Sequence, residues 1–292
     1  MSTVVFGVGF GIITAICFGL ANGIAQPLIK QFGSVVGVFW RNLPMSFFLF
    51  AVLFFVDHPP INLFYIVWTI ILSIILYIPL LSFFKAIEIG KIGIVTPVTN
   101  GFALITAVLG IIFFAESFTI AKTLAIGCIV GGIALLSFEP RQLTGGRRQF
   151  AKGVQYAFIA MVFWGVLFFL MKTPVQVVGP YLNAFIVNSV ICIAAAFHLL
   201  VLRRKKKYVF QRPSKKSFRL IWFAALFAAI GSVTLNMGMQ FSEVSIVVPI
   251  TAMNPLVSTL YAAIIHKEEL PLRQYIAACI VIGGIILMSL GL

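Results

Sequence analysis

The stretch "TPVTNGFALITAVLGIIFFAES", residues 96–117, is long enough to cross a membrane and carries no charge before Glu116. It nevertheless begins with a proline, two threonines and an asparagine, whose polar groups need hydrogen-bond partners once they leave water. A second stretch, "VPITAMNPLVSTLYAAIIHKEE" at 248–269, has proline, threonine and glutamate at the same spacing. Together the two stretches predict a membrane fold that contains a duplicated unit.

The composition places the whole chain in lipid. Of its 292 residues, 61% are apolar and only 10% are charged, which leaves too little polar surface for a soluble domain. Apolar runs of about 20 residues recur along the chain and match a hydrocarbon core about 30 Å thick. Alternation with period two is absent, which favours helices over a β-barrel. We therefore predict an all-α integral membrane protein with ten transmembrane helices, at 6–29, 35–56, 62–86, 92–114, 119–138, 153–172, 181–202, 218–240, 244–265 and 272–290.

The positive charges are distributed unevenly between the two ends of these spans. With ten spans, all 21 lysines and arginines except Arg41, Lys122 and Lys172 fall on one side. The positive-inside rule makes that side cytoplasmic, with loops 139–152 and 203–219 in the cytoplasm and both termini outside. The basic run from Arg203 to Arg219 predicts contact with anionic lipid, the alternative being a dedicated partner site. The net charge of +14 therefore does not indicate a nucleic-acid partner.

The chain contains two copies of one five-span unit. Residues 97–138 align without a gap with residues 249–290, and near the starts of the halves Gly19 pairs with Gly165 and Asn42 with Asn188. The predicted organisation is a first repeat at 1–140, a cytoplasmic linker at 141–152 and a second repeat at 153–292. Because five is odd, the second copy begins on the opposite side of the bilayer. Inverted repeats of this kind support alternating access around a midplane site, although some channels also contain them.

The order of several short motifs is similar to that of a known family. Tandem five-span units, with an aromatic-glycine pair in spans one and six, a proline opening spans four and nine, a glutamate closing them and glycine pairs in spans five and ten, resemble EamA-type members of the drug/metabolite transporter superfamily. The residues concerned are Phe18, Gly19, Trp164, Gly165, Pro97, Pro249, Glu116 and Glu268, with the glycine pairs at 131–132 and 283–284. The resemblance implies a ten-helix carrier of small metabolites, often amino acids or related compounds. It also implies a central cavity lined largely by spans three, four, eight and nine. Many relatives are described with cytoplasmic termini, whereas the charges here predict the reverse.

Polar residues inside the spans are the candidates for substrate binding, because desolvated polar groups face the bundle interior or a wet cavity. Proline at the head of spans four and nine can loosen the preceding turn and free carbonyl groups for a solute. The alternative for these threonines and asparagines is ordinary hydrogen bonding between helices. The predicted substrate-binding residues are Asn22, Arg41, Tyr77, Lys85, Thr99, Asn100, Asn236, Gln240 and Asn254. Predicted hinge or structural residues are Gly19, Gly165, Pro97, Pro249, Asn42 and Asn188.

Arg41 has two interpretations from the sequence. At a helix centre an arginine costs roughly 2.5–3.5 kcal/mol, but Arg41 lies about two turns from the predicted boundary and could extend its guanidinium to the membrane surface. It could instead bind a carboxylate or phosphate with two parallel hydrogen bonds. Both interpretations stay open at this point.

Several motifs of catalytic and energy-coupled proteins are absent from the sequence. Asp57 is the only aspartate, and there is no H-E-x-x-H, G-x-x-x-x-G-K-[ST] or G-x-S-x-G. The four cysteines lie in apolar runs without C-x-x-C spacing. We therefore predict no cofactor, no metal and no enzymatic activity, and ATP-driven transport by this chain alone is excluded. All glutamates lie near span ends, so uniport, exchange and proton coupling remain open.

The sequence thus predicts a secondary transporter for a small polar metabolite. Amides, hydroxyls and aromatic rings with few buried cations favour a neutral or zwitterionic solute, such as an amino acid, over a polyanion. A sugar or nucleotide-sugar carrier of the same superfamily, a channel and an integral-membrane enzyme are the alternatives.

Overall fold

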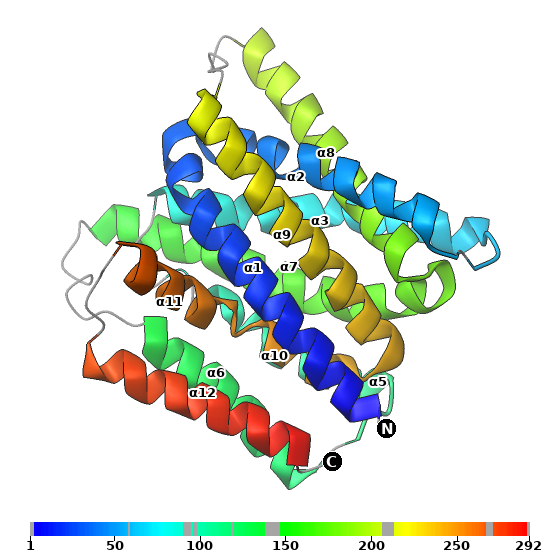
Figure 1. Ribbon diagram of the computed structural model, residues 1–292, viewed down its shortest axis with the longest axis vertical. Coiled ribbons are helices and arrows are strands. Elements are labelled where there is room, and N and C mark those ends of the chain that lie inside the picture. Colours follow the sequence, from blue (N-terminus) through cyan, green and yellow to red (C-terminus); the bar gives the residue numbers. More distant parts are fainter. Residues whose placement is uncertain are drawn as a thin grey trace.

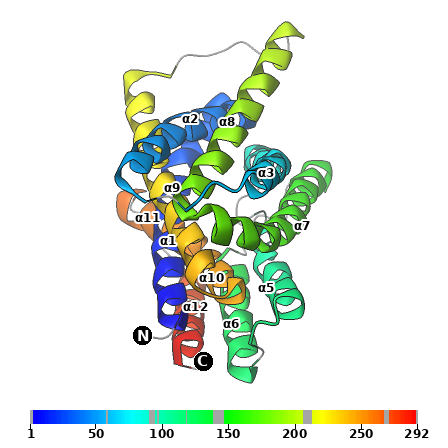
Figure 2. The same cartoon turned by 90° about the vertical axis from the view of Figure 1, so that its right-hand side faces the viewer.

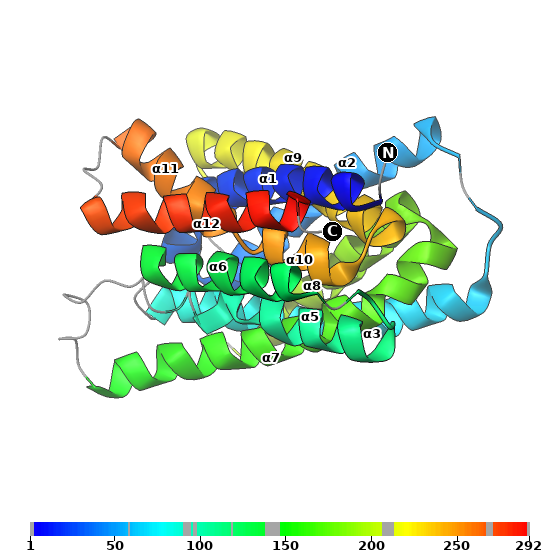
Figure 3. The ribbon, with the colours of Figure 1, turned by 90° about the horizontal axis from the view of Figure 1, so that it is seen from below.

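A computed structural model describes residues 3–57, 59–89, 95, 98–117, 119–137, 147–205, 213–266 and 271–290. Within these residues every regular element is a helix, and the helices run back and forth across one bundle (Figures 1 and 3). The first half contains α1 (Thr3–Phe32), α2 (Ser34–Val52), the 3-10 turn η1 (Leu53–Phe55), α3 (Leu63–Ile89), α5 (Phe102–Phe113) and α6 (Ile120–Ser137). The second half contains α7 (Arg147–Val178), α8 (Pro180–Arg204), α9 (Lys215–Phe241), α10 (Val244–Thr251), α11 (Asn254–His266) and α12 (Leu272–Leu290).

The helices form a multi-pass integral membrane protein. Eight segments of the described chain are long and apolar enough to cross a membrane, and two shorter apolar helices occur at Val98–Phe113 and Ile120–Leu136. Large apolar side chains cover the outside of the bundle, among them Phe47, Phe113, Phe197 and Phe223. Such a surface is stable when lipid covers it.

The two halves interleave and share one core. The most extensive helix pairs are α1 with α9, α3 with α7, α2 with α8, and α6 with α12, each joining one half to the other. In the repeat, α1 corresponds to α7 and α3 to α9, so the α1–α9 contact recurs as the α7–α3 contact. Figure 2 shows α6 and α12 at one edge of the bundle, away from α2 and α8. Each half therefore buries its apolar surface mainly against the other half.

Equivalent glycines in the two halves share a backbone conformation or a close helix contact. Gly33 precedes α2 with a φ of 85°, and Gly179 precedes α8 with a φ of 86°, a left-handed conformation that glycine adopts without strain. A Cβ at Gly19 would lie 2.5 Å from Val257 Cβ, and one at Gly165 would lie 2.6 Å from Ile105 Cβ. The glycines predicted as structural or hinge positions therefore sit where two helices approach closely.

The carbonyls of these two close-packed glycines also accept equivalent hydrogen bonds. Ser258 Oγ donates to the Gly19 carbonyl at 2.8 Å, and Thr106 Oγ1 donates to the Gly165 carbonyl at 2.8 Å. Ser258 and Thr106 occupy the same position of the repeat. The helix crossing at Gly19 and the helix crossing at Gly165 thus have the same close packing and the same type of hydrogen bond.

Predicted span nine is two helices rather than one. A turn at residues 252–253 separates α10 from α11, and Met253 N donates to Ile250 O at 3.1 Å in a bond that spans three residues. Pro255 follows at once, and its missing N–H and its ring disfavour a continuous helix here. Pro249 lies inside α10, so the irregular turn comes after this proline and not before it.

Predicted span four has its irregular turn at the equivalent place. Gly101 precedes α5, and its N–H donates to Val98 O at 3.2 Å. Gly101 and Met253 are equivalent in the repeat, as are Val98 and Ile250. Pro97, the predicted cause of a loosened turn here, lies outside the described residues. Both irregular turns fall near the middle of the bundle, where the cavity described below lies.

Candidate functional site

A cavity lies between the two halves. Its volume is about 150 Å³. This is enough room for on the order of ten water molecules. Its lining comes from α1, α2, α3, α5, α7, α8, α9, α11 and the ends of the helices before the two irregular turns, whereas no α6 or α12 residue takes part. The lining is therefore broader than the four spans that the resemblance implies.

The cavity brings together most of the predicted substrate-binding residues. Six of them line it, namely Asn22, Arg41, Thr99, Asn100, Asn236 and Asn254. Asn42 and Asn188, which we predicted as structural, line it as well. The predicted polar patches of spans four and nine thus face one shared space together with residues from spans one, two, seven and eight.

Three predicted substrate-binding residues lie outside this lining. The Tyr77 hydroxyl and His198 Nδ1 are 2.8 Å apart, joining α3 to α8. Lys85 Nζ donates to Glu88 Oε1 at 2.7 Å. Gln240 is partly buried near the end of α9. Gly19, Gly165 and Pro249 do not line the cavity either.

The lining follows the internal repeat almost position by position. Nine pairs of equivalent residues contribute both of their members: Phe18 and Trp164, Asn22 and Phe168, Arg41 and Val187, Asn42 and Asn188, Met45 and Ile191, Leu80 and Ser232, Phe83 and Leu235, Thr99 and Thr251, and Phe102 and Asn254. The cavity is therefore built from the same positions of both halves. The residue types within most pairs differ, so its two walls have different chemistry.

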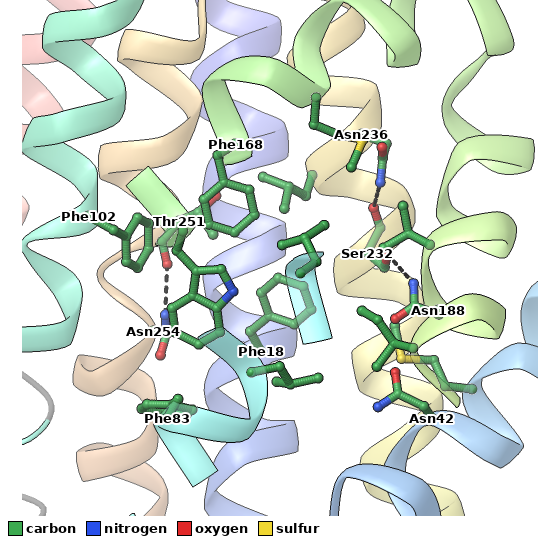
Figure 4. Close-up of a pocket in the computed structure, with 18 of the residues that line it drawn as sticks. Phe18, Asn42, Phe83, Phe102, Phe168, Asn188, Ser232, Asn236, Thr251 and Asn254 are labelled. Atoms are coloured by element: carbon green, nitrogen blue, oxygen red, sulfur yellow. Dashed lines mark hydrogen bonds between the residues drawn. The ribbon is translucent and has the colours of Figure 1, made fainter. Parts of the chain in front are cut away.

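One wall of the cavity is aromatic. Phe83, Phe102 and Phe168 gather on one side in Figure 4. Trp164 connects them, with its ring centroid 5.3 Å from Phe83 and 5.8 Å from Phe102. We did not predict this wall from the sequence, although the aromatic-glycine pairs of α1 and α7 already indicated Phe18 and Trp164. The wall suits the apolar part of a solute.

The opposite wall is an amide network that is already hydrogen-bonded (Figure 4). Asn183 Nδ2 donates to Asn236 Oδ1 at 2.7 Å, and Asn236 Nδ2 donates to Ser232 O at 2.7 Å. Asn188 Nδ2 donates to Ser232 Oγ at 3.0 Å and to Ala184 O at 2.8 Å. The bonds from Asn183 to Asn236 and from Asn188 to Ser232 join α8 to α9. Ser232 and Asn183 were not among the predicted site residues, and no sequence motif marks them.

Arg41 points inward and supplies a positive charge to the cavity. Its Cζ lies 5.9 Å from the ring centroid of Phe18 and 5.8 Å from that of Phe84. Its Nε is buried and has no hydrogen-bond partner in the described part of the chain. None of the described lining residues is acidic. The guanidinium therefore faces aromatic rings in the bundle instead of extending to the membrane surface.

Two ion pairs join the halves at the end of the bundle nearest the start of α1. Glu116 accepts hydrogen bonds from Lys172 Nζ at 2.5 Å, from the backbone N–H groups of Val244 and Ser245 at 2.9 and 3.0 Å, and from the Ser245 hydroxyl. Its side chain is 3% exposed. Burial raises the pKa of the Glu116 carboxyl, but the hydrogen bonds from Lys172 and Ser245 and the Lys172 charge outweigh it and leave the pKa below its ordinary value.

A second ion pair lies beside the first. Lys122 of α6 bonds to Glu243, the residue before α10, and to the Ser117 carbonyl at 2.9 Å. The sequence placed all four charged residues near span boundaries but did not pair them. The available signal was that Lys122 and Lys172 are the two basic residues predicted outside, with Glu116 and Glu243 nearby. We call Glu116, Lys172, Lys122 and Glu243 the outer network, after the side of the membrane on which the distribution of charges predicts them.

Comparison with known proteins agrees with this architecture. The EamA-like transporter family matches the chain twice, over residues 5–138 and 151–290. The curated "Uncharacterized protein MJ1333.1" of Methanocaldococcus jannaschii is 29% identical over 132 residues, a match that covers 45% of this chain and 92% of that protein. A solved structure titled "Crystal structure of protein" has the same fold, with a TM-score of 0.76, 16% identity and 97% of each chain covered. Because the two family matches together span nearly the whole sequence, the chain belongs to the EamA-like transporter family of the drug/metabolite transporter superfamily.

Proposed function

We propose that this membrane transporter is a secondary carrier that moves a small neutral or zwitterionic metabolite, such as an amino acid, by alternating access. One observation supports this most strongly: the cavity is lined by nine pairs of repeat-equivalent residues. A site formed equally by two similar halves can open to one side of the membrane and then to the other when the halves exchange conformations.

The proposal includes ten membrane spans arranged as two inverted five-helix repeats, at 1–140 and 153–292. The eight long apolar segments account for eight spans, with α10 and part of α11 forming span nine, and the shorter apolar segments at Val98–Phe113 and Ile120–Leu136 supply spans four and five. The recurrence of the α1–α9 contact as α7–α3 supports a two-fold relation between the halves. An odd number of spans in each half makes that relation inverted.

We also propose that the outer network faces away from the cytoplasm. The opposite end of the bundle carries the basic helix ends with Arg203, Arg204 and Lys215. Positive residues favour the cytoplasmic side, where they contact anionic lipid head groups. Residues 206–212, the centre of the predicted lipid-binding run, lie outside the described residues. A cysteine replacing Ser214 in a cysteine-free variant should resist an impermeant thiol reagent in intact cells and react after lysis. Labelling in intact cells would reverse the orientation.

The chemistry of the lining supports the proposed class of solute. Arg41 is the only charged residue among the described lining residues, and the remaining polar groups are amides and hydroxyls. A phosphate or nucleotide sugar carries more negative charge than one arginine neutralises. The volume fits a solute of amino-acid size. A single cation, an aromatic wall and an amide wall therefore favour a compact amphiphilic solute.

Counterflow in proteoliposomes tests the proposed function. Purified protein is reconstituted into liposomes, and these are loaded with one unlabelled solute at millimolar concentration. A trace of the same solute, carrying a label, is then added to the external medium. The panel contains amino acids, sugars, nucleosides and organic cations. A carrier accumulates label transiently and saturably, whereas a channel equilibrates it without accumulation. The function is contradicted if no solute enters above protein-free liposomes, or if entry never saturates.

A further inference from the structure

We propose that the cavity contains a head-group subsite for a solute with one carboxylate, formed by Arg41 and Asn42. This inference rests on the proposed function and specifies the chemistry that the same cavity recognises. It follows from polar atoms of both residues left without partners, from the geometry around Arg41 and from a difference between the repeats.

Three atoms of the lining are buried and have no hydrogen-bond partner in the described part of the chain. They are Arg41 Nε, Asn42 Oδ1 and Thr251 Oγ1. Buried polar atoms in folded proteins are nearly always paired, so an unpaired group at a cavity wall indicates a missing partner. The three atoms offer one charged donor, one acceptor and one hydroxyl that can do either.

The amide network does not compete for this role. Asn183 donates to Asn236, and Asn188 and Asn236 both donate to Ser232. The repeat explains one difference between Asn42 and Asn188: the Ser232 hydroxyl accepts a hydrogen bond from Asn188 Nδ2, whereas the position equivalent to Ser232 is Leu80, which carries no hydroxyl. Asn42 Nδ2 donates to Val38 O at 2.8 Å, and its oxygen stays free.

The surroundings of Arg41 favour a planar anion. Phe18 and Phe84 both lie within 6 Å of Cζ, an arrangement in which aromatic rings attract a cation. Rings accept no conventional hydrogen bond in the guanidinium plane, where a carboxylate binds with two parallel N–H···O bonds. Because none of the described lining residues is acidic, the solute is the natural source of the carboxylate.

Asn42 fits the second polar group of such a solute. Asn42 Oδ1 accepts a hydrogen bond from an ammonium or hydroxyl group next to the carboxylate. Thr251 lies across the cavity from Asn42, beside Phe102 (Figure 4), and is therefore not part of the head-group subsite. The apolar remainder of the solute then contacts the aromatic wall. A plain amine would instead place a second cation beside Arg41 with no anion to balance either charge.

Binding of matched solutes to the purified protein in detergent tests the subsite. The probes are L-alanine, L-leucine and L-phenylalanine, each compared with its own amide, which lacks only the carboxylate. Isothermal titration calorimetry gives the affinities. Carboxylates should bind the wild-type protein at least about 30-fold more tightly than the amides, the effect of truncating one partner of a buried charge pair.

Variants assign the effect to Arg41. Arg41→Gln should bind the three carboxylates at least about 30-fold more weakly and lose the preference over the amides, and Arg41→Lys should restore part of it. Arg204→Gln is the matched control, because it removes the same charge from an exposed helix end. Asn42→Leu should weaken amino-acid binding while keeping the preference for carboxylate over amide.

The outcomes separate the subsite from the proposed function. Equal binding of acids and amides by the wild-type protein overturns the subsite, as does unchanged carboxylate binding by a folded Arg41→Gln variant or no binding of any of the three acids. Counterflow of other solutes would still support a carrier in those cases. If Arg41→Gln does not fold, the wild-type comparison of acids with amides and the Asn42→Leu variant decide.

Discussion

The two halves of the cavity occupy equivalent positions but differ in chemistry. Arg41 in the first half corresponds to Val187 in the second, and Leu80 corresponds to Ser232. The second half ties its asparagines together through Ser232, whereas the first half leaves Arg41 Nε and Asn42 Oδ1 unpaired. Duplication thus explains where the cavity lies, and the departures from symmetry explain why the two halves offer different polar groups to a solute.

The two ends of the bundle differ in the same way. At the outer end, Lys172 and Lys122 join the halves through ion pairs, of which the Lys172–Glu116 pair is buried on both sides. Their equivalents in the other repeat are Gln26 and Gln274, which carry no charge. Lys172 and Lys122 therefore hold the halves together by ion pairs that Gln26 and Gln274 cannot form.

The largest loss of stability is expected when Lys172 is replaced by glutamine, the residue at the equivalent position 26 of the first repeat. Lys172→Gln matches Gln26 and leaves the Glu116 carboxylate buried without its cation, which should cost about 3–5 kcal/mol of stability. Thermal unfolding in detergent measures the loss. Lys85→Gln is the matched control, since its pair with Glu88 is 36% and 27% exposed and should contribute under about 1 kcal/mol. Equal shifts for both variants would show that the outer pair does not hold the halves together.

A smaller loss is expected where the halves are alike. Gly19→Ala and Gly165→Ala each place a Cβ within 2.6 Å of a neighbouring side chain, and such overpacking should cost about 1–3 kcal/mol. Gly9→Ala is the control, because nothing lies within 4 Å of a Cβ there, and within α1 it should be neutral or stabilise by up to about 1 kcal/mol. Unfolding temperatures of the three variants test this. A difference between Gly19→Ala and Gly165→Ala would break the equivalence of the two crossings.

The asparagine pair should respond unequally despite its symmetry. Asn188→Leu removes hydrogen bonds to Ser232 and Ala184 and should cost about 1–2 kcal/mol. Asn42→Leu removes one bond and an unpaired oxygen together, so its stability should stay within about 0.5 kcal/mol of wild type. The two unfolding temperatures, measured without solute, make the comparison. A larger loss for Asn42→Leu would mean that its oxygen has a structural partner.

The smallest effect is expected from pH. The pKa of the Glu116 carboxyl is lower in the folded protein than its ordinary value of about 4.3. Its contribution to stability is therefore complete above that ordinary pKa and is lost as the pH falls through the lowered folded value. The unfolding temperature should be flat from pH 7 to about 5 and fall at lower pH. Glu116→Gln should remove part of that acid dependence, and an unchanged pH profile in this variant would contradict the assignment.

Much of the architecture was predictable from local sequence. The apolar runs predicted membrane-spanning segments, and they predicted that these segments are helical because unpaired backbone groups are costly in lipid. Pro249 with Thr251, and Thr99 with Asn100, indicated where the helices would become irregular and polar, and these residues do meet near the cavity, although the turn follows Pro249. Gly19 and Gly165 were identified as equivalent and lie at equivalent close contacts.

The remaining features depend on which helices meet. The sequence by itself determined a duplicated membrane chain with polar residues near the middle of its spans, since hydropathy and repetition are local properties. Only the tertiary structure decided which side chains become partners. Asn236 accepts a hydrogen bond from Asn183, and Tyr77 bonds to His198 outside the cavity lining. Glu116 of the first half pairs with Lys172 of the second. Each of these pairs joins residues more than 50 positions apart. Side-chain partners at such separations are set by helix packing, which no short stretch of sequence encodes.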